Sequence, residues 1–219
     1  MRRISFKSGG ILNHRKDRRL SLLQLTLEAD GVEYDSLDWS LGGIRIDGDL
    51  SDWPEETPRI PLRNHFQAYG PTDLDDVDLG SSDDFSPSMM VGYDDDEDLL
   101  YVAVIVRDDE LHMEGDPIYR DGIEIYVSSL EDGSHPMQYR LATSRTGGGP
   151  TLRKGKISDT RADGAWRHEG DHLVYEWRLE VFDRFPGRSG QLDEGDLIGF
   201  DVVAIDNDGN GNAAWVPWG

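Results

Sequence analysis

The turn "DNDGNGN" at residues 206–212 carries the oxygen ligands that calcium prefers. Asp206, Asp208, Asn210 and Asn212 stand at alternate positions, and the intervening glycines let the chain curve tightly around an ion. The distal bidentate glutamate of an EF-hand loop is missing, so the turn is not an EF-hand. Two interpretations stay open at this point: a calcium site formed by these side chains, and a turn without metal.

A second pattern, "HEGDH" at residues 168–172, matches the H-E-x-x-H motif of zinc proteases letter by letter. Both imidazoles of that motif reach one zinc ion only when a helix presents them on the same face. Here Gly170 and Asp171 occupy the middle, and the alternating stretch "LVYEWRLEV" follows at once. We therefore expect a loop that joins two strands, and we predict no zinc site.

The chain is strongly acidic, and its charge is unevenly distributed. It has 22 Lys and Arg against 44 Asp and Glu; residues 1–43 carry a net charge of +1 and residues 44–219 a net charge of −23. The larger part would repel a phosphate backbone, which excludes general nucleic-acid binding there. Its carboxylates gather in loop-like runs without a distinctive pair, so we assign no catalytic residue and predict that the protein is not an enzyme.

Composition also bears on the compartment. The chain has no cysteine, so disulfides and thiolate chemistry are excluded, and no apolar run is long enough to span a membrane. Its basic start, "MRRISFKSGG", lacks the apolar core of a secretory signal. As written, the sequence indicates a cytoplasmic protein, or an extracellular or periplasmic one if a leader is missing.

The elements that must position these residues are strands. "GIEIYV" (122–127) and "YEWRLEV" (175–181) alternate apolar and polar residues, whereas "LLYVAVIV" (99–106) and "LIGFDVVAI" (197–205) are nearly continuous apolar runs. Period-two alternation is typical of antiparallel strands that cover a core on one side, and continuous runs are typical of central strands. With turn-rich connectors and no amphipathic helix, the pattern predicts an all-β antiparallel sandwich or barrel.

The N-terminal part resembles PilZ domains, which bind cyclic di-GMP. The resemblance rests on the pair Arg15-x-x-x-Arg19 and on Asp38-x-Ser40-x-x-Gly43. Arginine forks suit phosphate and guanine edges, and a glycine-containing turn lets backbone approach a ligand. The resemblance ends near residue 46, before the strands that complete a PilZ barrel. We therefore interpret residues 1–43 as an incomplete PilZ-like segment, either a cyclic di-GMP site or a remnant whose basic residues are simply solvated.

The remainder, residues 44–219, resembles the family-9 carbohydrate-binding modules and related DOMON-like domains. The resemblance rests on the order and spacing of "IRIDGDLSDWP", "MMVGYDDDEDLLYVAVIVRDDEL", "YRDGIEIYV", "YEWRLEV" and "GDLIGFDVVAIDNDGNG". It implies an antiparallel β-sandwich that binds sugars without catalysis and often carries structural calcium. The family normally adds a strand after "AAWVPWG", so the resemblance also implies that the last strand is missing.

The same resemblance implies a set of sugar-binding residues. Two aromatic side chains would clamp the sugar, Tyr93 and Trp215, with Trp218 as a substitute for the latter, because the C–H faces of sugars pack on aromatic rings. Glu97 and Arg120 would bond the sugar hydroxyls. The resulting hypothesis is a non-catalytic carbohydrate-binding sandwich. The alternatives are a cyclic di-GMP-responsive module and a structural sandwich without a ligand.

Overall fold

A computed structural model describes the chain in ranges separated by gaps. These ranges are residues 5–8, 23–24, 28–29, 32–33, 43–55, 57–62, 67–69, 85–94, 96–129, 136–145, 149–192, 196–208 and 213–218. Within them no helix has the length and apolar character needed to cross a membrane.

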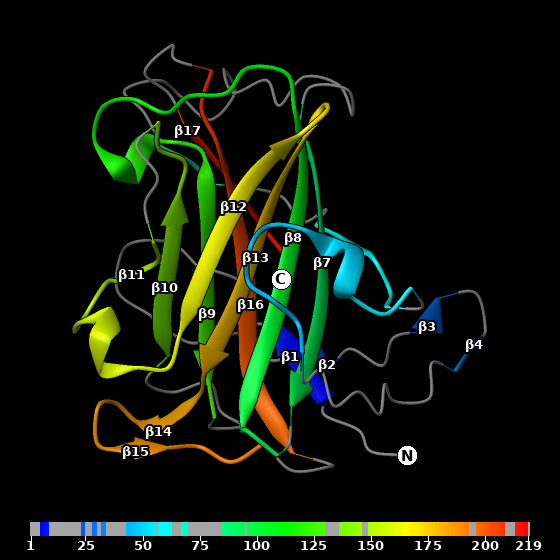
Figure 1. Ribbon diagram of the computed structural model, residues 1–219, viewed down its shortest axis with the longest axis vertical. Coiled ribbons are helices and arrows are strands. Elements are labelled where there is room, and N and C mark those ends of the chain that lie inside the picture. The colour runs from blue at the N-terminus through cyan, green and yellow to red at the C-terminus, as the bar shows by residue number, and fades with distance from the viewer. Residues whose placement is uncertain are drawn as a thin grey trace.

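Two β-sheets face each other in the described part of the chain (Figure 1). The small sheet has five strands in the order β12 (Asp163–Glu169), β13 (His172–Glu180), β8 (Leu99–Asp108), β7 (Phe85–Asp94) and β5 (Ile60–Pro61). The large sheet has eight, of which six run in the order β11 (Thr151–Leu152), β10 (Met137–Ala142), β9 (Gly122–Ser128), β16 (Leu197–Asp206), β1 (Ser5–Ser8) and β2 (Leu23–Gln24). Its remaining strands are β17 (Ala213–Pro217), which pairs with β16, and β6 (Gln67–Tyr69), which pairs with β17.

All pairings in these two sheets are antiparallel except that of β1 with β16. The prediction of an antiparallel β-sandwich is therefore confirmed. Shorter elements connect or flank the sheets: the strand pairs β3 (Glu28–Ala29) with β4 (Val32–Glu33) and β14 (Phe182–Arg184) with β15 (Arg188–Ser189), and the 3-10 turns η1 (Leu50–Asp52), η3 (Pro117–Tyr119) and η4 (Ile157–Asp159).

The main core lies between the sheets and is filled by alternate residues of their central strands. Ile123 and Ile125 of β9 meet Leu100 and Val102 of β8 in one buried cluster. In the same cluster the rings of Tyr139 and Trp177 touch edge to face, with centroids 6.4 Å apart. This alternation is why β9 and β13 show period two in the sequence.

Strand β8 is apolar on both faces because its second face is also covered. Leu99, Tyr101, Ala103 and Ile105 form a second buried cluster with Ile44, Trp53 and Met90, on the side of the small sheet that faces away from the main core. Met90 belongs to the neighbouring strand β7, whereas Ile44 and Trp53 belong to the stretch 44–54, which we call the N-terminal strap (cyan in Figure 1). A continuous apolar strand here therefore reflects a covered outer face.

One buried carboxylate holds the strap. Glu176 of β13 accepts hydrogen bonds from the backbone N–H groups of Asp47 and Gly48, both at 2.9 Å, and from the indole Nε1 of Trp53 at 2.8 Å. At Gly48 the backbone has φ +79°, and an added Cβ would lie 2.8 Å from the Cβ of Arg167 on β12. Only glycine lets the strap approach the sheet this closely, which explains the "IDG" and "DW" portions of the sequence.

The "HEGDH" stretch is the turn of a hairpin. Strand β12 ends at Glu169 and β13 begins at His172, so the predicted loop between two strands is confirmed. His172 pairs with Glu169, whereas His168 pairs with Leu173 of the main core cluster. Successive cross-strand pairs point to opposite faces of a sheet, so the two imidazoles leave on opposite faces and cannot share one ion.

The N-terminal segment contributes to the sandwich itself. Strand β1 pairs with the beginning of β16, and β2 pairs with β1. The residues predicted to bind cyclic di-GMP, namely Arg15, Arg19, Asp38 and Ser40, lie outside the described residues, and Gly43 is exposed with φ +111°. The division of the chain at residue 43 stays a prediction, although the large sheet extends across it.

Candidate functional site

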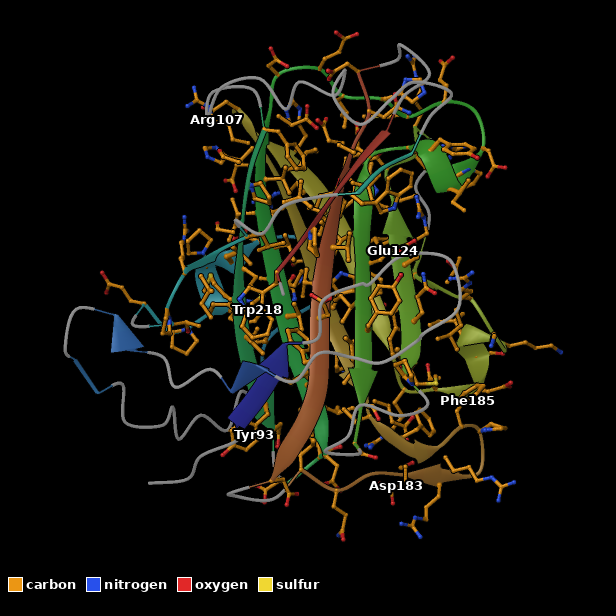
Figure 2. The ribbon with its side chains drawn as sticks, turned by 180° about the vertical axis from the view of Figure 1, so that it is seen from behind. Tyr93, Arg107, Glu124, Asp183, Phe185 and Trp218 are labelled. Atoms are coloured by element: carbon orange, nitrogen blue, oxygen red, sulfur yellow. The ribbon has the colours of Figure 1, made fainter. Side chains whose placement is uncertain are left out.

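The outer face of the large sheet carries a cluster of polar side chains on strands β9 and β10. Ile123, Ile125 and Val127 point into the core, so Glu124 and Tyr126 between them point outward. The register brings Arg140 of β10 opposite Glu124 and Gln138 opposite Tyr126. Figure 2 looks onto this face, with Glu124 labelled on β9.

Glu124 is the centre of this cluster. Its Oε1 accepts from Arg140 NH1 at 2.6 Å, and its Oε2 accepts from the Tyr126 hydroxyl at 2.7 Å and from Gln138 Nε2 at 2.9 Å. The side chains of Glu124 and Arg140 are only 8% and 12% exposed. A largely desolvated carboxylate–guanidinium pair with neutral donors around it is a rigid, charge-assisted arrangement.

Arg140 also connects this cluster to the turn η3. Its NH2 donates to the carbonyl of Pro117, and the Asn207 side chain donates to the carbonyl of Tyr119. The Asp116 carboxylate caps the turn by accepting from Ile118 N at 3.1 Å. Ile118 and Tyr119 are each 48% exposed and are the large apolar side chains that stand out at the surface of the described chain.

Trp215 of β17 lies on the same face. It pairs with Ile205 of β16, and Ile205 pairs with Gly122 of β9. Directly paired residues of neighbouring strands point to the same side of a sheet, and strands lie about 4.8 Å apart, so Trp215 stands roughly 10 Å across the sheet from Gly122. The half-buried indole of Trp215 and the exposed ring of Tyr119 therefore lie near the same end of the large sheet.

This arrangement combines aromatic surface with fixed hydrogen-bonding groups. An aromatic ring offers an apolar platform for the C–H face of a flat, polyhydroxylated ligand. The carboxylate, guanidinium and amide beside it offer acceptors and donors for hydroxyl groups. These groups suit recognition of such a ligand.

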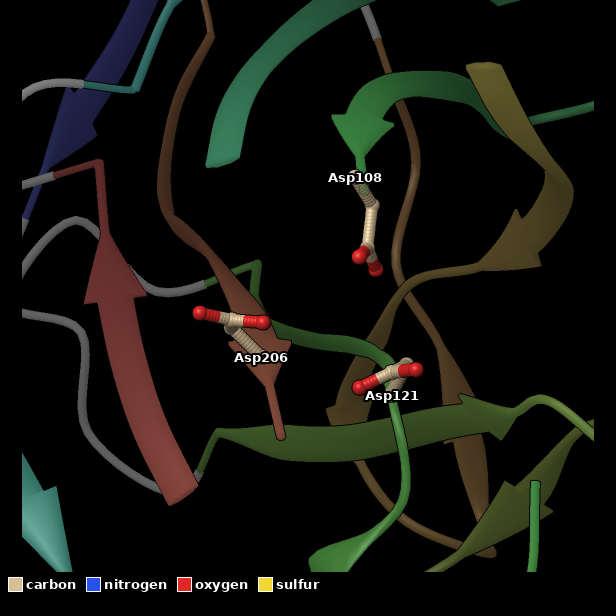
Figure 3. A group of neighbouring side chains, drawn as sticks. All are labelled: Asp108, Asp121 and Asp206. Atoms are coloured by element: carbon tan, nitrogen blue, oxygen red, sulfur yellow. The ribbon is translucent and has the colours of Figure 1, made fainter. Parts of the chain in front are cut away.

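Three carboxylates meet next to this surface. Asp108 at the end of β8, Asp121 just before β9 and Asp206 at the end of β16 each offer an oxygen within 4.8 Å of the others (Figure 3). Asp121 and Asp206 are buried. Burial, followed by the nearby charge of Asp108, raises the pKa of Asp121 from 3.8 to about 8.

This cluster fits a divalent cation. Its ligand atoms are carboxylate oxygens, the donors that calcium takes at close range, and a cation would offset both the burial and the carboxylate repulsion that raise the pKa of Asp121. Asp121 also accepts from the backbone N–H groups of His112 and of Asn207, the latter at 2.9 Å. Asp121 therefore fixes the loop before η3, and it fixes Asn207, whose side chain donates to the Tyr119 carbonyl.

The predicted calcium turn contributes to this cluster in part. Asp206 belongs to it, whereas Asn210 and Asn212 lie outside the described residues. Asp208 is half-buried, and burial, with the charges of Asp109 and Glu110, raises its pKa. Asp108 and Asp121 were missed because strand ends distant in sequence supply them. The available signal was an aspartate at one end of each of the three apolar strands β8, β9 and β16.

The other predicted sugar-binding residues are separated by the fold. Tyr93 is 6% exposed and belongs to the main core, as does Trp218, which is 7% exposed and packs near Phe200 with ring centroids 6.1 Å apart. Glu97 follows Tyr93 in the β7–β8 hairpin, where it pairs with Arg161 at 3.6 Å. Arg107 lies near the end of β8, and Figure 2 shows Tyr93 at the opposite end of the sandwich from it.

Trp215 and Arg120 lie at the η3 end instead. Arg120 follows the turn directly, and its Nε and NH2 donate to the carbonyl of Gly115 at 3.1 and 2.6 Å. Glu124, Arg140 and Tyr119 were not singled out from the sequence. The polar positions of "GIEIYV" and "QYRLAT" could have found the first two, because they must share the outward face once those strands pair.

Comparisons with known proteins identify relatives of the same fold. The sequence matches a family described as "Carbohydrate family 9 binding domain-like" over residues 64–219. Two similar solved structures are carbohydrate binding modules of family 9 from Caldicellulosiruptor kristjanssonii, one in complex with cellotriose and one with glucose. A search of curated proteins gave no match.

The structural likeness covers most of each chain. The cellotriose complex aligns with a TM-score of 0.58 at 19% identity, over 80% of this chain and 80% of that chain. The glucose complex aligns with a TM-score of 0.56 at 18% identity, over 81% of this chain and 83% of that chain. The family match begins at residue 64 and gives the cyclic di-GMP hypothesis no support.

Proposed function

This chain belongs to the carbohydrate family 9 binding domain-like family, and from that premise we propose that it binds a carbohydrate, without catalysis, on the outer face of the large sheet. Glu124 and Arg140 would bond sugar hydroxyls, and Tyr119 and Trp215 would pack against the sugar ring. Arg120 stands beside them at the end of η3.

One observation carries this proposal: the Glu124–Arg140 ion pair, at 2.6 Å, is tied through Pro117 to a turn that exposes an aromatic ring. Sugars need an apolar face and directional polar groups at one place. Tyr93 and Trp218, by contrast, present almost no ring surface in this structure, so we place the sugar at Tyr119 and Trp215.

The ligands of the two similar structures suggest which sugars to test first. Those modules were solved with cellotriose and glucose. We propose gluco-configured neutral sugars as the ligand class, which also fits the net charge of −22, because a polyanionic glycan would be repelled.

We also propose that Asp108, Asp121 and Asp206 hold a calcium ion. The ion would supply positive charge between carboxylates that otherwise repel each other. Asp121 and Asn207 would then keep the loop before η3 in place, so the metal supports the sugar site without contacting the sugar.

Calorimetric titration with glucose and cellotriose tests the sugar site. Tyr119→Ala and Trp215→Ala should each weaken binding of whichever sugar the wild type binds, by about tenfold, the upper range for one aromatic contact. Tyr93→Leu is the matched control, because it removes an aromatic ring from the opposite end of the sandwich. Unchanged affinity in both of the first two variants, with loss in Tyr93→Leu, would move the site to the β7–β8 end.

A further inference from the structure

Two neutral side chains converge on one oxygen of Glu124. The Tyr126 hydroxyl, from the same strand, and Gln138 Nε2, from the neighbouring strand β10, both donate to Oε2. Gln138 is itself held through its Oε1, which accepts from Arg153 NH1 at 3.0 Å. The carboxylate is therefore fixed from one side by residues that do not carry the exposed aromatic surface.

The other oxygen of Glu124 leads toward the aromatic turn. Oε1 accepts from Arg140 NH1 at 2.6 Å, and Arg140 NH2 donates to the carbonyl of Pro117, the first residue of η3. A continuous chain of hydrogen bonds thus runs from Tyr126 through Glu124 and Arg140 to the turn that carries Tyr119.

We propose that Tyr126 and Gln138 are positioning residues for the carbohydrate site: they fix Glu124, which fixes Arg140, which fixes the turn of Tyr119. This inference rests on the proposed function. It adds that the hydrogen-bonding groups and the stacking ring are preset relative to one another before the sugar arrives. Such preorganisation increases affinity because little ordering remains to be done on binding.

The hydrogen-bond capacity of Glu124 supports this assignment. An ionised carboxylate has about four lone-pair positions, and Tyr126, Gln138 and Arg140 fill three of them. In this proposal the fourth position accepts from one sugar hydroxyl.

The donor at Tyr126 is permanent. Burial, and then the neighbouring Glu124 charge, raise the pKa of Tyr126 far above its ordinary value, with Asp201 adding to the rise and Arg153 opposing it. The hydroxyl therefore stays protonated and keeps donating to Glu124 throughout the pH range in which the protein would be studied.

Tyr126→Phe tests the inference, because it removes only the hydroxyl. The matched control is Tyr139→Phe, which removes a buried hydroxyl that donates to the Glu180 carbonyl at 2.8 Å. Tyr139 lies on the next strand and faces the core. We expect Tyr126→Phe to bind glucose or cellotriose more weakly, by up to about tenfold, because Glu124 must then be ordered when the sugar binds, and Tyr139→Phe to keep wild-type affinity.

Amide hydrogen exchange provides a readout that needs no sugar. The Tyr119 amide donates to the Asp116 carbonyl at 2.9 Å within η3. If the hydrogen-bond chain fixes the turn, this amide should exchange faster in Tyr126→Phe than in wild type or Tyr139→Phe. Gln138→Leu, which frees the same Glu124 oxygen, should show the same two effects and serves as the second variant if Tyr126→Phe folds poorly.

A double-mutant cycle with Arg140→Lys tests the route of the effect. Lysine offers one nitrogen in place of the NH1 and NH2 atoms that bond Glu124 and Pro117 separately, so adding Tyr126→Phe to Arg140→Lys should cost less affinity than in the wild type. Wild-type exchange and affinity in both Tyr126→Phe and Gln138→Leu would overturn the inference while leaving the proposed function intact. A wild-type protein that binds neither glucose nor cellotriose refutes the proposed ligand class, whereas the exchange result shows by itself whether Tyr126 and Gln138 fix the turn.

Discussion

The strap is held by a carboxylate whose replacement should have a large and specific effect. Glu176 accepts from Asp47 N, Gly48 N and Trp53 Nε1, and its side chain has no exposure to solvent. Glu176→Gln keeps the shape of the side chain and replaces one acceptor oxygen by an NH2 group. The new NH2 group is a donor, so it faces either the N–H of the Trp53 indole or the backbone N–H groups of Asp47 and Gly48, and no hydrogen bond can form there.

The expected cost follows from these contacts. If the amide oxygen stays with Asp47 and Gly48, the bond from Trp53 is lost and a buried N–H is left unsatisfied, which costs about 1–3 kcal/mol. The two remaining bonds become neutral ones and weaken by roughly 0.5 kcal/mol or more each. We therefore expect Glu176→Gln to lower the unfolding free energy by about 2–4 kcal/mol.

Urea unfolding of the wild type, Glu176→Gln, Trp53→Phe and the double variant measures this cost. Trp53→Phe should be destabilising in the wild type and much less so in Glu176→Gln, because it then removes an unsatisfied donor. A Glu176→Gln variant within about 0.5 kcal/mol of the wild type, or losses that simply add in the double variant, would refute the proposed role of Glu176.

Three further changes have expected outcomes. Gly48→Ala should destabilise the fold by about 2 kcal/mol or more in the same urea assay, because its Cβ would lie 2.8 Å from that of Arg167 at φ +79°; an unchanged midpoint would contradict the close approach. Because the pKa of Asp121 is raised from 3.8 to about 8, the folded protein holds this proton more tightly than the unfolded chain. The stability that the protonated carboxyl contributes is therefore lost as the pH rises through that range. Calcium should accordingly raise the melting temperature more at about pH 8.5 than at about pH 5, and Asp121→Asn should abolish this difference between the two pH values. A variant that keeps the wild-type difference would place the ion elsewhere. Purified protein dialysed against zinc should retain no stoichiometric ion at His168 and His172, and metal analysis that finds one zinc lost in His168→Ala would show the hairpin assignment to be wrong.

The strands could be predicted from the sequence because the pattern of apolar and polar residues along each strand is visible there. The alternation in "GIEIYV" and "YEWRLEV" predicted β9 and β13, and the apolar runs predicted β8 and β16 within one or two residues. The turn residues Gly170 and Asp171 predicted that the "HEGDH" pattern is not a zinc helix. In each case the deciding interactions are local, so the sequence order alone expresses them.

The site depended on strand register, which the sequence does not state. Glu124 meets Arg140 only because β9 pairs with β10 in one register, and Trp215 reaches the same face only through β16. A shift by one residue would turn Glu124 into the core and Ile123 outward.

By itself, the sequence determined which segments are strands, which face of each strand is apolar, and that the chain is an acidic sandwich of the carbohydrate-binding type. Only the tertiary structure decided that Asp108 and Asp121 join Asp206, that Tyr93 is buried, and that Tyr119 stands beside the Glu124–Arg140 pair. The physical reason is that strand formation depends on neighbours in sequence, whereas contact between side chains depends on pairing and packing across distant segments.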